Sequence, residues 1–280
     1  MKTLKRVVIT GVGTISSAGN SVTELWSSLI EGKSGIDKIT SFDASNQTSQ
    51  IAGQVKNFDP KEHFNSKEVK KMDRMNHLSL VASRQAVTDS GLDLEKENLN
   101  RFGVMYGSGV GGMQTFETQT RNLIEKGPSR VSPFFIPMEI IDMTSGMISM
   151  EFQFKGPNFS IVSACATGTH AVGESARTIA MGDADVVLTG STEAAVTPLG
   201  VAGFCSLKAL SRNNDNPQKA SRPFDLNRDG FVIAEGAATI ILEEYEHAKA
   251  RGAKIYGELV GYGASGDAYH MTQPAPGGEG

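Results

Sequence analysis

The chain has 280 residues, with 27 lysines and arginines against 31 aspartates and glutamates, and 39 % of it is hydrophobic. This length suffices for one large domain or two smaller ones with a substantial core, and the net charge of −4 excludes a generally basic protein that coats nucleic acid. No stretch approaches the roughly 18 apolar residues of a membrane span, and two cysteines are too few for a disulfide framework. These features predict a cytoplasmic α/β protein with reduced thiols.

Short β-rich runs alternate along the chain with longer segments of helical periodicity, and glycines mark many junctions between them. This alternation predicts a largely parallel sheet covered by helices. The one candidate domain boundary follows a helix that ends near Gly252. In chain order we expect a strand over 6–10, helices over 21–31 and 66–90, a strand over 101–106, a helix over 113–125, a strand over 158–162, a helix over 169–181, strands over 186–189, 231–234 and 238–243, a helix over 244–251 and a strand over 254–262.

Two glycine-containing segments resemble ligand loops but depart from their patterns. Gly107, Gly109 and Gly112 have the GxGxxG spacing of a dinucleotide loop between a strand and a helix. About 20 residues further on, no strand ends in the acid that would hold a ribose, so close packing and tight turns are the favoured interpretation. Segment 225–236 begins like a calcium loop, but Glu235 stands one residue before the position of the bidentate ligand. We therefore predict no nucleotide cofactor and no metal.

Cys165 is the candidate nucleophile of the chain. It stands where a predicted strand ends in small residues and a helix begins, a corner that lifts a side chain clear of a sheet. A thiol near a helix N-terminus is favoured as thiolate by the helix dipole. The alternative is a buried structural cysteine, and the neighbouring residues alone do not decide between the two. Cys205 lies in an apolar segment and is expected in the core.

None of the five histidines can be assigned from the sequence as the base for this thiol. His170 follows the cysteine by five residues, which turns it about 140° around a helix, so it should point elsewhere. His247 belongs to a charged helix and is expected in solvent, and His63 and His77 are expected to be surface or satisfied polar residues. His270 lies in a glycine-flanked loop, a setting suited to a functional site, but its sequence position does not tell whether its side chain reaches the thiol of Cys165.

Residues 163–168, Ser-Ala-Cys-Ala-Thr-Gly, resemble the active-site segment of the β-ketoacyl-acyl-carrier-protein synthases. The segment 267–272 is most similar to synthase II, the elongating form that accepts long acyl chains. The resemblance implies a thiolase-like α/β fold of two βαβαβαββ halves, with α-β-α-β-α layers when complete. Residues 1–252 would form the N-terminal half and residues 253–280 the beginning of the C-terminal half. Further motifs of the family occur in its order at 1–20, 107–112, 181–185, 221–225, 228–231 and 235–237.

The resemblance also implies fatty-acid chain elongation by decarboxylative Claisen condensation. Cys165 would accept an acyl group from the phosphopantetheine of an acyl carrier protein, and malonyl carrier would lose carbon dioxide and attack the acyl-cysteine. The family forms homodimers and uses no metal or organic cofactor. Its catalytic histidines and catalytic lysine lie in the second half. This chain would therefore be a fragment of a complete synthase or, as a whole polypeptide, inactive in condensation and poorly folded by itself.

Further site residues are assigned by the resemblance alone. Val110 and Phe204 match positions that line the acyl pocket, with plain core residues as the alternative. His270 and Thr272 match positions near the substrate entrance, and the backbone N–H of Cys165 matches an oxyanion donor. The basic surface for the acidic carrier, which would otherwise be a solvated charge run, comprises Lys67, Lys70, Lys71, Arg130 and Lys208.

Three other functions remain open at this point. A polyketide-type ketosynthase would share most of these motifs. A chain-length-factor-like protein would bind carrier and partner without forming an acyl-cysteine, although the presence of Cys165 argues against it. The last alternative is a structural fragment without catalysis.

Overall fold

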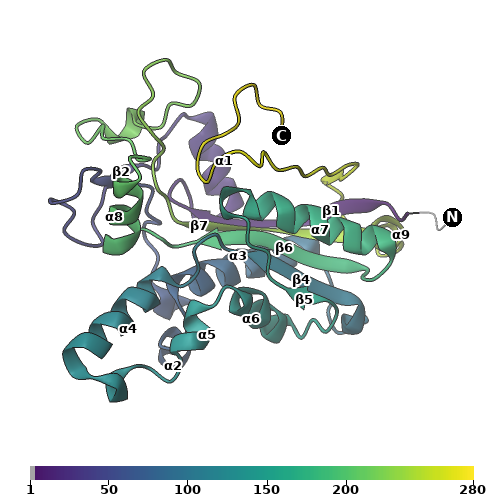
Figure 1. The fold of residues 1–280 in the computed structure, drawn as a ribbon. Helices are drawn as coiled ribbons and strands as arrows, with labels where there is room; N and C mark the ends of the chain where they lie inside the picture. Colours follow the sequence, from purple (N-terminus) through teal and green to yellow (C-terminus); the bar gives the residue numbers. More distant parts are fainter. Residues whose placement is uncertain (1–3) are drawn as a thin grey trace.

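Figure 1 shows the fold as given by a computed structural model, which describes residues 4–280. A six-stranded sheet with the strand order β5-β4-β6-β7-β1-β8 forms the centre, and β2 and β3 form a small separate sheet. The strands are β1 (Val7–Ser16), β2 (Asp37–Lys38), β3 (Ile51–Ala52), β4 (Phe102–Gly107), β5 (Asn158–Phe159), β6 (Val186–Glu193), β7 (Gly236–Glu244) and β8 (Gly257–Glu258).

Helices cover both faces of the central sheet, with α3 and α6 on one face and α7 on the other (Figure 1). Within residues 4–280, no helix has the length and apolar character needed to span a membrane. The helices are α1 (Val22–Ile30), α2 (Ser66–Val69), α3 (Arg74–Ser90), α4 (Met113–Lys126), α5 (Phe135–Glu139), α6 (Asp142–Phe152), α7 (Thr167–Met181), α8 (Pro198–Ser206) and α9 (Tyr245–Ala250).

The alternation of side chains along the strands divides the core into two layers. In β4, Phe102, Val104 and Tyr106 are buried in the cluster beneath α3 and α6, whereas Met105 is buried with Ile179 in the cluster beneath α7. Successive side chains of a strand point to opposite faces, so β4 serves both layers. A sheet covered on both faces therefore needs nearly continuous apolar strands.

The sheet is mixed, which corrects the prediction of a largely parallel one. β4 pairs in parallel with β5 and with β6, but β7 runs antiparallel to both of its neighbours, β6 and β1, and β8 runs antiparallel to β1. The reason is that the connection between β6 and β7 does not carry the chain back to the edge of the sheet where β6 begins. The start of β7, Gly236, pairs with the end of β6, Glu193. β7 instead runs back directly beside β6, and the alternation of helices and strands does not reveal this reversal.

Strand β1 continues to Ser16, beyond the predicted end at residue 10. Its glycines lie beneath helix α3, where a β-carbon at Gly11 would stand 2.3 Å from the carbonyl oxygen of Ala86 and one at Gly13 would stand 2.1 Å from that of Ala82. Gly11 and Gly13 therefore serve a close helix-to-strand contact.

The predicted helix over 66–90 is interrupted. It forms α2 and α3, and Asp73 between them is the N-cap of α3 and accepts a hydrogen bond from the N–H of Met75. The predicted strand over 231–234 is also wrong, because Phe231 and Ala234 form only isolated bridges. Helices α5, α6 and α8 were not predicted, because their sequences lack a clear polar face.

Candidate active site

Cys165 lies in a single helical turn, Ala164–Ala166, directly before α7. Its side chain is exposed, so the interpretation as a buried structural cysteine is wrong. Cys205 is half-buried and packs against an apolar cluster. A thiol that faces solvent at the start of a helix is available for chemistry, whereas one in an apolar cluster is mainly a packing group.

The turn that presents Cys165 is braced from two sides. Ala164 has φ of +49°, a left-handed conformation that non-glycine residues adopt at a cost of about 1 kcal/mol or more. The backbone N–H of Ser163 donates to the hydroxyl of Thr167 at 2.9 Å. A β-carbon at Gly107 would stand 2.2 Å from the methyl carbon of Thr167 and 2.5 Å from the carbonyl oxygen of Ile161. The end of β4 therefore has to be glycine for this turn to pack against it.

The same geometry accounts for the glycine spacing at residues 107–112. A β-carbon at Gly112 would stand 2.4 Å from the carbonyl oxygen of Met138, and Gly111 has φ of +85°. The interpretation of these glycines as close-packing and turn residues is confirmed. Their spacing follows from contacts of the segment with α7 and with the end of α5.

Helix α7 begins without a side-chain cap, because Ala166 at its N-cap offers no acceptor. The start of α7 places the positive end of the helix dipole beside Cys165. Negative charge develops on a thioester oxygen when a thiolate attacks the carbonyl carbon. Donors and a dipole near that oxygen stabilise the transition state.

Cys165 lines a cavity of about 560 Å³. Val110 and Phe204 line it as well, and both pack against the apolar cluster around Val201 and Ile233. The ring of Phe204 meets Phe231 edge-on with centroids 5.4 Å apart. The structure thus brings together the predicted nucleophile and both residues predicted to line an acyl pocket, in a space of the size that small-molecule sites have.

Glu193, at the end of β6, is a further group in this cavity that was not predicted. Its carboxylate accepts hydrogen bonds from the hydroxyl of Ser108 at 3.0 Å and from the N–H of Gly109 at 2.9 Å. Burial raises the pKa of this carboxyl, and the hydrogen bonds oppose that rise. An acidic residue at the end of an apolar strand is the signal that could have drawn attention to it.

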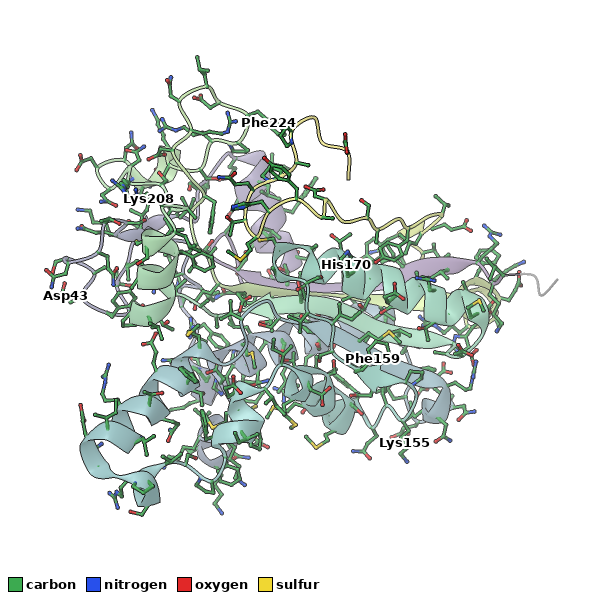
Figure 2. The ribbon with its side chains drawn as sticks, viewed as in Figure 1. Asp43, Lys155, Phe159, His170, Lys208 and Phe224 are labelled. Atoms are coloured by element: carbon green, nitrogen blue, oxygen red, sulfur yellow. The ribbon has the colours of Figure 1, made fainter. Side chains whose placement is uncertain are left out.

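Among the described residues, no histidine lines the cavity with Cys165. His170, labelled in Figure 2, contacts the hydroxyl of Ser163 through Nδ1 at 2.7 Å. His270 lies in the C-terminal loop, where its Nδ1 accepts a hydrogen bond from the N–H of Thr272 at 3.1 Å. The structure therefore does not bring His270 or Thr272 to the cavity.

The expectations for two other histidines are wrong. His247 is not free in solvent, since its ring contacts Glu243 at 2.6 Å and Glu97 at 3.1 Å. His77 is buried, and its Nε2 has no hydrogen-bond partner among residues 4–280. Burial, with the nearby charge of Arg74, lowers the pKa of His77 to about 4.

The predicted basic residues do not form one continuous group. Lys67, Lys70 and Lys71 are exposed in and directly after α2, and Lys71 lies 4.8 Å above the ring of Phe134 at the start of α5. Arg130 ends a short turn that contacts α4. Lys208, labelled in Figure 2, follows α8, which Figure 1 shows apart from α2.

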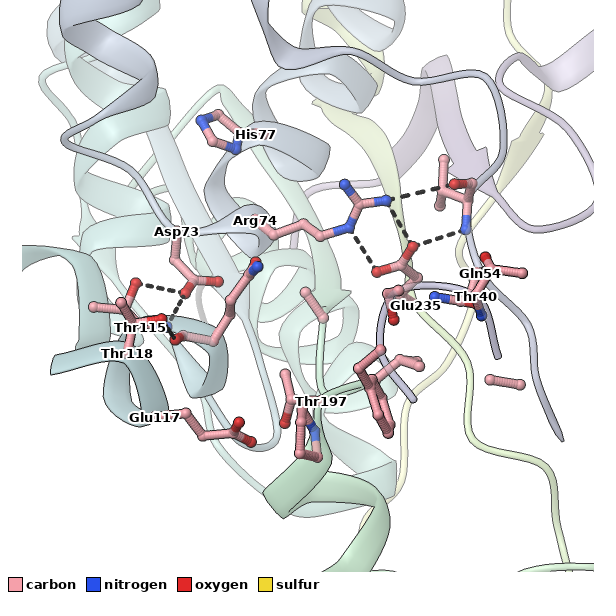
Figure 3. A pocket seen from close by; sticks show the side chains of 18 of the residues that line it. Thr40, Gln54, Asp73, Arg74, His77, Thr115, Glu117, Thr118, Thr197 and Glu235 are labelled. Carbon is pink, nitrogen blue, oxygen red and sulfur yellow. Dashed lines mark hydrogen bonds and ion pairs between the residues drawn. The ribbon is translucent and has the colours of Figure 1, made fainter. Parts of the chain in front are cut away.

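A second and larger cavity, of about 850 Å³, lies near the start of α3 (Figure 3). Arg74 makes a two-pronged ion pair with Glu235, with both N···O distances 2.7 Å. Asp73 accepts from the N–H and the hydroxyl of Thr115 at 2.9 and 2.7 Å. The charged side chains of Asp73 and Arg74 in this larger cavity thus join different elements of the fold. Cys165 does not line this cavity. Within residues 4–280, no cluster of three or more potential ligand side chains is placed to hold a metal ion.

Comparison with known proteins identifies the class of protein to which this site belongs. Residues 4–248 match the N-terminal domain of the β-ketoacyl synthases, and the chain belongs to this family. It is 52 % identical over 276 residues to the 3-oxoacyl-[acyl-carrier-protein] synthase 2 of Coxiella burnetii and of Vibrio cholerae, and 50 % identical to that of Staphylococcus aureus strain COL. These matches cover 99 % of this chain and 66–67 % of the relatives, so the chain spans about two thirds of their length.

Solved structures confirm the thiolase-like fold. A β-ketoacyl synthase from Burkholderia phymatum is 34 % identical with a TM-score of 0.85, covering 96 % of this chain and 66 % of its own. The ishigamide ketosynthase/chain length factor is 32 % identical with a TM-score of 0.88, covering 97 % and 66 %. The higher identity to the synthase 2 relatives confirms the predicted family, a condensing acyltransferase of fatty-acid elongation, over the polyketide and non-catalytic alternatives.

Proposed function

We propose that this chain supplies the nucleophile and the acyl pocket of a 3-oxoacyl-acyl-carrier-protein synthase. The observation that carries this proposal is the exposed thiol of Cys165 at the start of α7, on a cavity that Val110 and Phe204 also line. A nucleophile beside an apolar cavity of this size suits a thioester whose acyl chain is long and uncharged. No metal or organic cofactor enters the proposed reaction.

The step assigned to these residues is acyl transfer. The sulfur of Cys165 attacks the thioester carbonyl, a new carbon–sulfur bond forms, and the bond to the phosphopantetheine sulfur breaks; that sulfur leaves with the proton of the thiol. In the condensation that follows, malonyl carrier loses carbon dioxide, and the electron pair of the broken carbon–carbon bond forms a new bond to the acyl carbon. Cys165 then leaves as thiolate. No described histidine is assigned to this second step.

Intact-protein mass spectrometry tests the acyl transfer. After incubation with a long-chain acyl carrier protein, the chain should gain one acyl group, and peptide mapping should place it on Cys165. Cys165→Ser should abolish the adduct. Cys205→Ser is the matched control, because it removes the other thiol of the chain and should leave the adduct in place. An adduct on Cys165→Ser, or none on the unchanged chain, would contradict the proposal.

We infer that the carrier protein docks on the exposed lysines in and directly after α2. One similar structure is described as a type II polyketide acyl-carrier protein in complex with its ketosynthase. An acidic carrier would be steered by local positive charge on a chain with a net charge of −4. The double change Lys67→Glu and Lys71→Glu should weaken carrier binding and flatten its dependence on salt. Lys33→Glu, after α1, is the control, and equal effects of both changes would refute the assignment.

We also propose a homodimer and a cytoplasmic location. The edge strand β5 supports the dimer, since it pairs only with β4 among residues 4–280 and leaves Phe159 exposed (Figure 2). Two free thiols suit a reducing compartment. Phe159→Asp should shift the mass measured by light scattering from dimer to monomer.

We retain the division into residues 1–252 and 253–280 as a proposal, which the end of the family match at residue 248 supports.

A further inference from the structure

The carboxylate of Glu193 fastens a segment of chain that lies 83 to 85 residues away in the sequence. Oε1 accepts from the hydroxyl of Ser108 at 3.0 Å, and Oε2 accepts from the N–H of Gly109 at 2.9 Å and of Val110 at 3.2 Å. The hydroxyl of Ser108 in turn accepts from the N–H of Gly111 at 3.0 Å. The carboxylate thus binds three consecutive residues directly and a fourth through the hydroxyl of Ser108.

This fastened segment joins the acyl cavity to the nucleophile. Val110 lines the cavity, and its neighbour Gly109 lies between Glu193 and the turn that presents Cys165. A β-carbon at Gly109 would stand 2.9 Å from Glu193 Oε2 and 3.4 Å from the carbonyl oxygen of Ala164. A movement of Glu193 would therefore displace both a wall of the cavity and the support of the Cys165 turn.

The carboxylate does this without a cationic partner among residues 4–280, where its described contacts are a hydroxyl and backbone N–H groups. Burial of an unpaired carboxylate opposes ionisation and raises its pKa. Burial of such a carboxylate beside a largely apolar cavity costs free energy, and an apolar side chain could fill the same space without that cost. A role in shaping the cavity accounts for its presence there.

We propose that Glu193 is a positioning residue of the acyl site, which holds Val110 in the wall of the cavity into which Cys165 opens. The inference rests on the proposed function for the identity of the ligand, a long acyl chain. It predicts that loss of the carboxylate impairs reactions that fill the cavity more than reactions of the thiol alone.

Two alkylating reagents with the same reactive group separate these effects. Iodoacetamide reports on the thiol, and N-decyl iodoacetamide reports on the thiol together with the cavity. In Glu193→Ala, the rate of Cys165 alkylation by the decyl reagent should fall about tenfold relative to the rate with iodoacetamide. Glu193→Gln should keep the ratio within about threefold, because its amide oxygen still accepts from backbone N–H groups.

Asp185→Asn is the matched control, since Asp185 is a hydrogen-bonded carboxylate directly before the other end of β6. It should leave the ratio unchanged. If Glu193→Ala does not fold, Ser108→Ala provides the second test, because it removes one of the contacts and should lower the ratio in the same direction. The inference would be overturned if Glu193→Ala and Ser108→Ala left the ratio of the two alkylation rates unchanged, whether both rates fell equally or neither rate fell. The ratio is measured without carrier protein, so it stands or falls separately from acyl transfer.

Discussion

The Nδ1 atom of His170 lies 2.7 Å from the hydroxyl of Ser163, two residues before Cys165 in the chain. The histidine ring also meets the ring of Tyr262 edge-on, with ring centroids 6.3 Å apart. His170 therefore contacts the segment that leads into Cys165, and no hydrogen bond joins it to the thiol. The expectation from helix geometry that it points away from Cys165 agrees with this contact.

Replacement of His170 should leave the reactivity of the thiol almost intact. His170→Ala removes no group that could take the proton of Cys165, so the rate of alkylation by iodoacetamide should change by less than about threefold. Alkylation rates measured across pH 5 to 10 check this, and loss of an ionisation from the profile would show that His170 acts as the base.

Asp73→Ala should destabilise the protein by about 2 kcal/mol or more. The side chain of Asp73 caps α3 by accepting from the N–H of Met75. It also accepts from the N–H of Thr115, the third residue of α4, and the N-cap residue of α4 offers no side-chain acceptor of its own. Both helix starts lose their acceptor at once. Urea unfolding measures the change, with Asp59→Ala as the control because that exposed residue caps only a short turn.

The cluster around Glu243 should make stability depend on pH in two directions. Burial opposes ionisation of Glu243, but hydrogen bonds from Arg251, His247 and Thr10 lower its pKa to about 2 from an ordinary 4.5. Its contribution is therefore complete above about pH 4.5 and is lost as the pH falls toward 2. The hydrogen bond to Glu243 raises the pKa of His247, so that contribution is complete below pH 6.5 and is lost as the pH rises through the raised value.

Thermal unfolding across pH 2 to 9 tests this cluster. The contribution of these two groups should be greatest between about pH 4.5 and 6.5. Glu243→Gln should reduce both slopes, because it removes the shared partner, whereas Glu151→Gln, in an exposed ion pair with Arg84, should leave them in place. Parallel curves for the native protein and Glu243→Gln would contradict the assignment.

Two glycine-to-alanine changes should have opposite effects. At Gly107 the new methyl group would collide with Thr167 and with the backbone of Ile161, so Gly107→Ala should lower stability and disturb the turn that presents Cys165. At Gly203, inside α8, the new carbon meets nothing within 4 Å beyond its chain neighbours and the backbone of its own helix, and alanine should raise stability by up to about 1 kcal/mol. Unfolding midpoints measure both changes; an unchanged or raised midpoint for Gly107→Ala would show that the crowding there is relieved at little cost.

Local signals in the sequence predicted several elements closely. The helix expected over 113–125 is α4, and the strand expected over 101–106 is β4, displaced by a residue at each end. Where prediction failed, a distant contact decided the outcome. Gly11 and Gly13 belong to β1 because α3 packs on them, and the break between α2 and α3 contains Asp73, which α4 also uses.

The sequence by itself identified the family, because the residues around Cys165 and the motifs along the chain are local patterns. By resemblance it also predicted that Val110 and Phe204 line one pocket, and both line the cavity of Cys165. Only the tertiary structure decided that the sheet is mixed and that Glu193 fastens the segment of Val110. The physical reason is that strand direction and hydrogen bonds across 83 residues depend on how the chain returns to itself, and no local pattern records that path.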